Sequence, residues 1–218
     1  LDVNTIKTLK WHFFEIDGLP TMDGLVYNDS LDAYEISTDR DLMVFSKILS
    51  RISDNFISEN YVIMNNIDMS NYKGYVPPKE EFEGHLFGAN PVELGSNKNT
   101  NKVISNLVLS NPYSTEEEIY YGLLTKCSGT VSNLNFSNCE IQIQKNNEFV
   151  SKKTYAGIVC GKLLNGTVEH VLTNSTITNP DNGAIGEAYI GGVVGYGNGL
   201  INKVANLGNI NLGSNLSF

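Results

Sequence analysis

Three histidines, His12, His85 and His170, are the side chains of this sequence best suited to proton transfer or metal binding near neutral pH. Metal-dependent hydrolysis needs such ligands close together, as in the His-Glu-x-x-His turn of a helix. Each histidine of this chain is isolated, and neither His12 nor His85 has a partner that the sequence reveals. We therefore predict no metal site and no metal cofactor.

Carboxylates are the second group that could carry chemistry, because glycoside hydrolases use a pair of them at a defined separation. The C-terminal half of this chain contains repeated strands, in which such a pair would lie at equivalent positions of neighbouring repeats. These strands carry Ser, Asn, Thr and Gln at outward positions, and the exceptions are Glu140 and Glu169. The residues that align with Glu169 in the other repeats are Ser105, Ser132 and Asn202. No column of acids forms, so we predict no catalytic residue.

Two further signals have structural explanations. The stretch from Gly191 to Gly199 is rich in glycine, but it lacks the Lys-Ser/Thr and the following helix of a phosphate-binding loop, so we interpret it as a strand and its turn.

Cys127, Cys139 and Cys160 are odd in number and widely spaced, unlike a disulfide framework or a zinc site. We expect Cys160 to be a buried core residue, and a bridge between Cys127 and Cys160 is the alternative.

Loop tyrosines are the candidate ligand contacts, since an aromatic ring with a polar tip suits the recognition of glycans and proteins. The tyrosines that we expect to be exposed are Tyr72, Tyr75 and Tyr113, together with Tyr120. Others recur one to three residues before a repeated glycine, and we expect them to pack within the fold: Tyr121, Tyr155 and Tyr189.

A phrase that recurs in the C-terminal half must position these side chains. Its copies begin at Ile104 (ISNLVLSN), Val131 (VSNLNFSN), Val168 (VEHVLTN) and Ile201 (INKVAN), and each follows a strand of Gly and aliphatic residues. The offsets between copies are 27, 37 and 33 residues. This spacing is typical of the coils of a parallel β-helix with insertions in its loops. The sequence therefore predicts an all-β fold, a right-handed parallel β-helix.

Stacked copies should place equivalent side chains in columns, because no coil can bury its inner face alone. The expected columns are Val131 over Val168 over Ile201, and Leu134 over Val171 over Val204. Polar positions drift between copies, which is typical of corners and outward faces. One such position is occupied by Asn106, Asn133, His170 and Lys203. We therefore expect His170 to have a turn or surface role.

The N-terminal part is less regular. Residues 1–36 read as a lead-in with short strands, and residues 37–218 read as a helix and coils in one continuous domain. Apolar residues recur at helical spacing over 39–52, after a capping box of Thr38 and Asp41. This helix could cap the first coil. We see no equivalent cap at the C-terminal end, and we interpret the chain as part of a longer protein.

Composition limits the partners. Hydrophobic residues make up 41% of the 218 residues and charged residues only 18%, with a net charge of −9. An acidic chain repels phosphate backbones and anionic lipid, so we expect no binding to nucleic acid or to a membrane surface. No run approaches the ~18–20 apolar residues that a membrane span requires, so we expect no membrane insertion. We expect a monomer that needs no cofactor.

The order of these features resembles a family over roughly residues 34–212. A helix is followed by an Asn-x-Ile-Asp-Met strand, a Phe-x-Gly-x-x-x-Gly segment and Ile-Ser-Asn-Leu repeats, each preceded by a Gly-aliphatic strand. This resembles secreted and cell-surface bacterial β-helix proteins with GLUG-type repeats, although only Gly192-Val-Val-Gly195 keeps both glycines of the repeat. Such proteins include adhesin-like chains and non-catalytic regions of immunoglobulin A1-type metallopeptidases.

The resemblance implies a non-catalytic, extracellular scaffold or adhesion module that binds a host or matrix protein or a glycan. We expect binding through variable loops on a rigid frame. Those loops are residues 65–101, 112–120, 144–153 and 178–187. The alternative is an accessory region of a secreted peptidase or of a polysaccharide-active β-helix enzyme, with the chemistry outside this chain.

Overall fold

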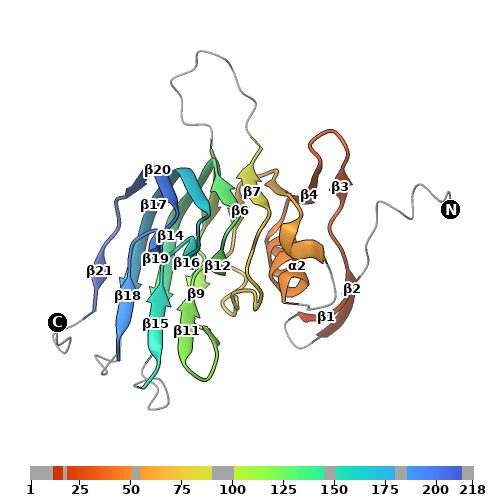
Figure 1. The fold of residues 1–218 in the computed structure, drawn as a ribbon. Helices are drawn as coiled ribbons and strands as arrows, with labels where there is room; N and C mark the ends of the chain where they lie inside the picture. Colours follow the sequence, from red (N-terminus) through yellow and green to blue (C-terminus); the bar gives the residue numbers. More distant parts are fainter. Residues whose placement is uncertain are drawn as a thin grey trace.

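The fold is a parallel β-solenoid of about four turns with one α-helix near its N-terminus (Figure 1). The computed structural model describes residues 12–16, 19–50, 55–89, 101–144, 151–179 and 186–212. The predicted all-β class, the parallel β-helix and the N-terminal helix are confirmed.

The elements before the regular coils are β1 (His12–Ile16), β2 (Leu19–Asp23), β3 (Tyr27–Asn28), β4 (Ala33–Ile36), helix α2 (Asp39–Leu49), the 3-10 helix η1 (Asn55–Ser58) and β5 (Tyr61–Ile63). The next group comprises β6 (Ile67–Asp68), β7 (His85–Gly88), β8 (Lys102–Ser105), β9 (Val108–Leu109) and β10 (Tyr113–Ser114).

The second coil consists of β11 (Glu118–Tyr121), β12 (Leu124–Cys127), β13 (Thr130–Ser132) and β14 (Leu134–Gln142). The third consists of β15 (Lys153–Ala156), β16 (Cys160–Leu163) and β17 (Thr167–Thr178). The last consists of β18 (Ala188–Ile190), β19 (Val194–Gly197), β20 (Leu200–Asn206) and β21 (Ile210–Asn211).

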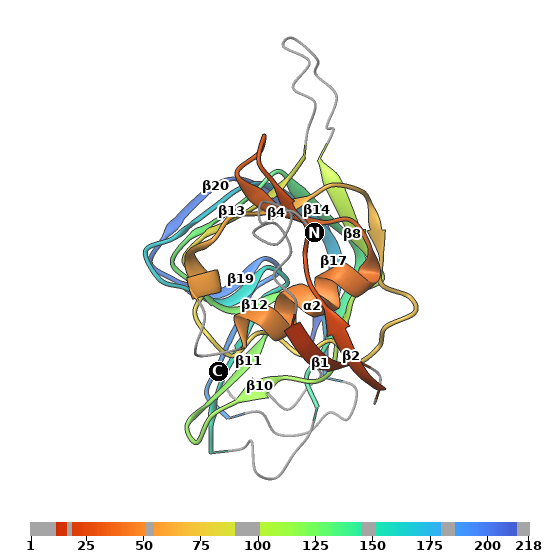
Figure 2. The same cartoon turned by 90° about the vertical axis from the view of Figure 1, so that its right-hand side faces the viewer.

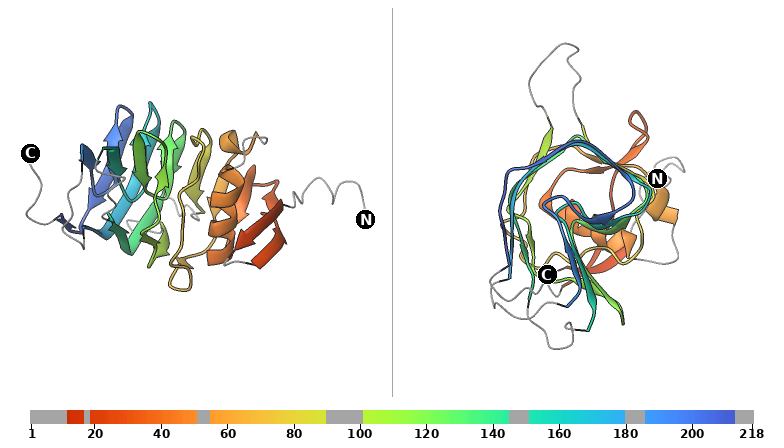
Figure 3. Two further views of the ribbon diagram at one scale, coloured as in Figure 1. Left: turned by 90° about the horizontal axis from the view of Figure 1, so that it is seen from below. Right: turned by 60° about the vertical axis from the view of Figure 1, so that its left-hand side comes forward.

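Equivalent strands of successive coils pair in parallel and form the walls of the solenoid (Figure 3). One wall stacks β4, β5, β7, β13, β17 and β20 in that order. A second sheet stacks β12, β16 and β19, and a third stacks β11, β15 and β18, with β10 added antiparallel at its edge. Strand β4 belongs to the lead-in predicted over residues 1–36, so the first wall extends into that segment.

The predicted columns of core side chains are present in the register. Val131 pairs with Val168, and Val168 pairs with Ile201. Val171 pairs with Val204 in the same way. The apolar positions of the repeat therefore hold because each inner side chain lies on its equivalent in the next coil.

The predicted alignment of the first copy is wrong. Ile104 pairs with Phe136 and not with Val131, whose partner on that side is Leu86 of β7. The phrase that begins at Ile104 thus lies under the second half of the next coil. Ser105 pairs with Ser137, so it does not align with Glu169 as the sequence suggested.

At two corners of the coil, equivalent non-glycine residues of successive coils lie in the left-handed backbone region. Asn133, His170 and Lys203 share one corner with φ values of 56°, 53° and 51°, and Asn106 and Asn138 share the other with 57° and 53°. Asn tolerates this region better than most residues because its side chain can hydrogen-bond locally. The predicted turn role of His170 is confirmed, but Asn106 belongs to the other corner.

Amide side chains form a ladder along the second corner. Asn138 Nδ2 donates a hydrogen bond to Asn106 Oδ1 at 2.6 Å, and Asn106 Nδ2 donates to Asp68 Oδ1 at 2.8 Å. The hydrogen bond from Asn106 lowers the pKa of Asp68. These hydrogen bonds tie β6, β8 and β14 together at a position where the backbone turns.

Helix α2 closes the N-terminal end of the solenoid (Figure 2). The predicted capping box is present, since Asp41 N donates to Thr38 Oγ1 at 3.1 Å and Thr38 N donates to Asp41 Oδ2 at 2.9 Å. The helix was predicted over 39–52 and ends at Leu49, followed by Ser50 as its C-cap. Residues 51 and 52 lie outside the described residues.

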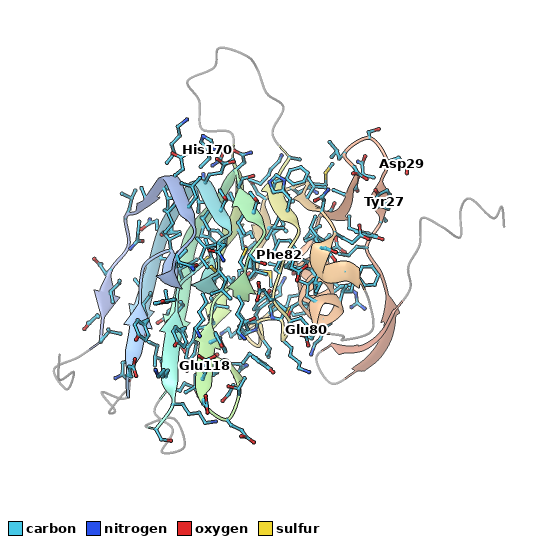
Figure 4. All side chains as sticks on the ribbon, in the orientation of Figure 1. Tyr27, Asp29, Glu80, Phe82, Glu118 and His170 are labelled. Carbon is cyan, nitrogen blue, oxygen red and sulfur yellow. The ribbon has the colours of Figure 1, made fainter. Side chains whose placement is uncertain are left out.

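Aromatic rings join the helix to the first coil. Phe45 contacts Tyr61 edge to face, with ring centroids 4.8 Å apart, and Phe82 with centroids 6.1 Å apart. All three rings are fully buried, and Phe82 is labelled between α2 and the coils in Figure 4. Ser46 Oγ also donates a hydrogen bond to Val76 O at 2.5 Å. The helix is therefore an integral part of the core.

Candidate binding surface

Three of the four predicted loops directly precede, in the sequence, strands that lie side by side in one sheet. Strands β11, β15 and β18 run parallel, with Glu118 paired to Lys153 and Thr154 paired to Ala188. Their first residues therefore lie along one edge, which we call the loop edge (Figure 1). The segments that precede these strands are 112–117, 144–152 and 179–187. Part of the predicted loop 112–120 is in fact a hairpin of β10 and β11.

The fourth predicted loop has a different position. Strands β6 and β7 lie within residues 65–101, residues 90–100 lie outside the described residues, and the last residue, Asn101, lies near the corner occupied by His170. Asn101 Nδ2 donates a hydrogen bond to His170 O at 2.7 Å, which places the end of this segment at that corner. His170 and Glu118 are labelled at opposite edges of the solenoid in Figure 4. This segment is therefore not part of the loop edge.

A stack of tyrosines runs along the outer face beside the loop edge. We call it the tyrosine ladder, and its members are Tyr113, Tyr120, Tyr155 and Tyr189. Successive ring centroids are 6.4, 5.6 and 5.1 Å apart, with interplanar angles of 25°, 21° and 4°. Tyr196 of β19 meets Tyr189 edge to face at 5.3 Å. Four strands thus contribute one continuous aromatic column.

Strand alternation decides which tyrosines belong to the ladder. Side chains of neighbouring residues point to opposite faces of a strand. Ile119 and Tyr121 are part of the main hydrophobic core, so Tyr120 between them points outward. The register then places Tyr155 on Tyr120 and Tyr189 on Tyr155. Tyr155 and Tyr189 do pack, as predicted, but they belong to the column of Tyr120 and not to that of Tyr121.

Lysines of the adjacent sheet cover the ladder. Lys126 and Lys162 occupy equivalent positions on β12 and β16. Lys162 Nζ lies 3.9 Å from the ring centroid of Tyr155, and Lys126 Nζ lies 5.3 Å from that of Tyr120. Both distances permit cation–π attraction. The ladder is therefore flanked by lysine ammonium groups that contact its rings.

Glu118 links the ladder to these lysines. Its carboxylate accepts a hydrogen bond from the Tyr120 hydroxyl and pairs with Lys162 Nζ at 2.6 Å. Partial burial alone would raise the pKa of Glu118, but the hydrogen bonds from Lys162 and Tyr120 outweigh it and hold the pKa below its ordinary value. Burial, followed by the hydrogen bond to Glu118, raises the pKa of Tyr120. The hydroxyl therefore stays protonated at physiological pH.

The same pattern recurs at the last coil. Tyr189 donates a hydrogen bond to Glu187 Oε1 at 2.5 Å, and Lys153 Nζ lies 3.3 Å from Glu187 Oε2. Charges along the loop edge thus alternate in sign from Glu118 to Lys153 to Glu187. A surface of this kind offers both donors and acceptors beside aromatic rings.

Exposure divides the ladder into a buried middle and accessible ends. Tyr120 is 0% exposed and Tyr155 is 6% exposed, because each ring is covered by its neighbours. Tyr113 and Tyr189 are partly exposed, and Tyr196 is 45% exposed. A ligand would therefore meet the two ends of the ladder and the polar groups along its side, since the faces of the middle rings are stacked on one another.

The predicted ligand contacts have different outcomes. Tyr113 belongs to the ladder and is partly exposed. Tyr72 is partly buried against the main core. The expected exposure of Tyr75 and Tyr120 is wrong. Tyr75 is 0% exposed and its hydroxyl donates to Leu123 O at 2.9 Å, because the loop that carries it folds into the core.

A polar pair on another wall escaped the sequence analysis. His85 Nε2 lies 2.8 Å from Ser132 Oγ, although 47 residues separate them. Burial lowers the pKa of His85, and the negative charge of Glu169 opposes that shift. An alignment of β7 with β13 would have predicted this pair. The sequence alignment placed Ile104 opposite Val131 instead, so it did not bring β7 and β13 together.

Acidic side chains do not gather into a metal site within the described ranges: no group of three or more His, Cys, Asp or Glu residues there could hold an ion. Glu169 pairs with Ser132 and Asn202, as predicted. Glu140 accepts hydrogen bonds from Gln142 Nε2 at 2.9 Å and from Thr178 Oγ1 at 3.1 Å. These contacts satisfy both oxygens of Glu140 within its own wall.

The three cysteines are free and buried. Cys127 pairs with Leu163 and Cys160 pairs with Leu124, so the register does not bring the two thiols opposite each other and the alternative of a bridge fails. Burial raises the pKa of Cys127 to about 12 and that of Cys139 to about 11, and it raises the pKa of Cys160 as well. These thiols are core side chains without nucleophilic character at neutral pH.

Comparison with known proteins gives no match. No family model matches the chain, and no curated protein or solved structure matches it at a significant level. The structure contributes one further finding on partners: among the described residues, no helix has the length and apolar character that crossing a membrane requires.

Proposed function

We propose that this chain is a non-catalytic β-helix module of a bacterial surface or secreted protein, which acts outside the cell as a rigid scaffold for adhesion. The loop edge and the accessible ends of the tyrosine ladder would bind a host or matrix protein or a glycan. The observation that carries this proposal is that β11, β15 and β18, each of which directly follows a predicted loop in the sequence, begin along one edge beside the tyrosine ladder.

Several features of the loop edge support a binding role. Paired strands hold its first residues at fixed positions, and loops on such a frame are the usual place for recognition. Rigid aromatic side chains supply contact area at a small entropic cost. Glu118, Lys153 and Glu187 offer charged partners of both signs beside the rings. Together these groups suit a polar, partly aromatic ligand.

The test is a binding panel of immobilised matrix proteins and glycans. The wild-type chain is compared with a variant that carries Tyr113→Ala, Tyr189→Ala and Tyr196→Ala. We expect the wild type to bind at least one member of the panel and the variant to bind it about tenfold more weakly or worse, as is usual when aromatic anchors are removed.

The matched control carries Thr130→Ala and Thr167→Ala, two paired residues on a different wall. This control should bind like the wild type. Equal loss of binding in both variants would show that the loop edge has no special role. A wild-type chain that binds no member of a broad panel would contradict the adhesive function itself.

A further inference from the structure

The tyrosine ladder holds two phenol rings in nearly parallel contact. Tyr155 of β15 and Tyr189 of β18 are register partners on parallel strands. Their ring centroids lie 5.1 Å apart, and the angle between the ring planes is 4°. Because the two strands run in the same direction, both rings extend the same way and their equivalent atoms lie side by side. The ring carbons next to the two hydroxyl groups are therefore neighbours.

Other close contacts between tyrosines have a different geometry. Tyr196 meets Tyr189 with centroids 5.3 Å apart, but the two ring planes cross at 76°. Tyr27 and Tyr34, on the N-terminal side of the fold, approach to 5.0 Å and cross at 67°. A crossed pair directs the edge of one ring at the face of the other. Tyr155 and Tyr189 are thus better placed for a bond between equivalent ring atoms.

A carboxylate lies where the phenolic proton of Tyr189 would go. Tyr189 donates a hydrogen bond to Glu187 Oε1 at 2.5 Å. This hydrogen bond raises the pKa of Tyr189, and the hydrogen bonds from Tyr189 and Lys153 lower the pKa of Glu187. The phenol is therefore protonated and the carboxylate ionised at neutral pH. A phenol that loses an electron becomes a strong acid, and Glu187 can accept its proton directly.

The middle of the ladder can share the oxidation. Tyr120 stacks on the other side of Tyr155 at 5.6 Å, and its hydroxyl donates to Glu118. Electrons pass readily between aromatic rings in contact, so a radical formed on one ring can reach the next. Lys162 lies over Tyr155 and opposes positive charge there, but its ammonium group is paired with Glu118 at 2.6 Å. Tyr155 can therefore be oxidised although it is largely buried.

We propose that Tyr155 and Tyr189 are a site of oxidative cross-linking, at which a haem peroxidase and hydrogen peroxide join the two rings as dityrosine. Each phenol loses one electron and its hydroxyl proton. The two radicals then form a carbon–carbon bond between the ring carbons next to the hydroxyl groups. Each of these carbons releases its hydrogen as a proton while the phenol oxygen takes one up, which restores the aromatic ring. One hydrogen peroxide accepts the two electrons and two protons and becomes two molecules of water.

The cross-link would join the third coil to the last described coil through β15 and β18. A covalent bond between two distant segments restricts the unfolded chain, as a disulfide does. The oxidised protein should therefore unfold at a higher urea concentration than the untreated protein. This proposal does not rest on the adhesive function, since it needs only the two rings, the carboxylate and the oxidant.

Peroxidase treatment of the dilute wild-type chain, followed by trypsin digestion and tandem mass spectrometry, tests the proposal. We expect dityrosine fluorescence and a cross-link between the tryptic peptides 154–162 and 163–203. Tyr189→Phe keeps the ring and should lose this cross-link. The matched control is Tyr196→Phe, which changes a tyrosine of the same peptide that contacts Tyr189 edge to face, and it should keep the cross-link.

Two further measurements separate the fold from simple reactivity. Glu187→Gln keeps both rings and should form the cross-link more slowly than the wild type, because the proton acceptor is lost. Wild-type chain unfolded in urea should oxidise without a preference for this pair. An absence of dityrosine, cross-links mainly between different chains, a cross-link that survives Tyr189→Phe, or equal coupling of Tyr27 with Tyr34 would each overturn the proposal. An equal rate in Glu187→Gln would overturn the role of the carboxylate.

Discussion

At the N-terminal end of the solenoid a helix lies across the first coil, whereas the last described coil faces no further element (Figure 3). Phe45 of the helix is fully buried against Tyr61 and Phe82, and Ile201 at the other end is half exposed. Both ends are built from the same kind of coil. The difference shows that a coil does not bury its own inner face, and that whatever lies beside it decides its burial.

Removal of the ring that closes the N-terminal end should have the largest effect. Phe45→Ala leaves a cavity among Tyr61, Phe82 and the helix, and such truncations cost about 3–5 kcal/mol. Urea unfolding followed by circular dichroism measures the loss. Val26→Ala removes an exposed side chain and should change the free energy of unfolding by less than about 0.5 kcal/mol. A loss below about 1 kcal/mol for Phe45→Ala would show that the helix is not an integral cap.

The same column can be truncated in its middle and at its end. Val168→Ala removes two fully buried methyl groups and should cost about 2 kcal/mol. Ile201→Ala removes more atoms, but they are half exposed, so the cost should be about 1 kcal/mol or less. Urea titrations compare the two. Equal costs would contradict the contrast between a middle coil and an end coil.

The capping box offers a smaller change at the closed end. Thr38→Ala removes the acceptor for Asp41 N and should lower the free energy of unfolding by about 1 kcal/mol. Thr38→Ser keeps the hydroxyl and should restore most of the loss. Thermal unfolding of the three proteins is sufficient. If Ser and Ala behave alike, the hydrogen bond contributes little to the closure.

The tyrosine ladder connects the coils between the two ends. The carboxylate of Glu118, which accepts a hydrogen bond from Tyr120, should make the stability depend on pH. The folded-state pKa of Glu118 is held below its ordinary value of 4.5, so its stabilising contribution is present above pH 4.5 and is lost as the pH falls below that value. Glu118→Gln should be less stable than the wild type at pH 7, by less than about 1 kcal/mol because solvent screens the pair.

The difference between Glu118→Gln and the wild type should shrink in unfolding curves recorded at decreasing pH. Glu117→Gln removes an exposed neighbouring carboxylate and should alter the stability at pH 7 by less than about 0.5 kcal/mol. A constant difference between Glu118→Gln and the wild type from pH 7 to pH 3 would mean that the ion pair with Lys162 does not stabilise the ladder.

The smallest expected effect lies at a corner of the last described coil. Lys203 has a φ of 51° at a corner where Asn133 occupies the equivalent position of the second coil. Lys203→Asn should relieve part of the left-handed strain and stabilise the fold by about 0.5 kcal/mol. Thermal unfolding measures it, with Lys102→Asn on β8 as the control. Destabilisation by Lys203→Asn would show that the lysine side chain contributes more than the corner costs.

The repeats in the sequence predicted the pairing of buried residues better than the alignment of corner and outward-facing residues. The column of Val131, Val168 and Ile201 was predictable because apolar identity persists where side chains stack. The misalignment of Ile104 has a simple cause. The copy of the repeated phrase that starts at Val131 contains two Ser-Asn pairs, one ending at Asn133 and one at Asn138. Both pairs form left-handed corners, so local pattern alone fits Ile104-Ser-Asn106 to either one.

The ladder shows why the candidate site was only partly predictable. Tyr120 and Tyr121 are adjacent, and a shift of one residue exchanges the inner and outer faces of a strand. The residues around them in the sequence do not determine which of the two aligns with Tyr155. The burial of Tyr75 likewise depends on Leu123, which is distant in sequence. Each of these outcomes rests on a contact between segments that the chain brings together only when it folds.

The sequence by itself determined the repeated unit, the inner columns of the last three coils and the helix that starts after Thr38, because each follows from local spacing and from capping chemistry. The tertiary structure decided which half of a coil receives Ile104, which tyrosines form the ladder and which strands begin along one edge. These depend on strand register and on stacking order, and both are set by pairing between residues far apart in the chain.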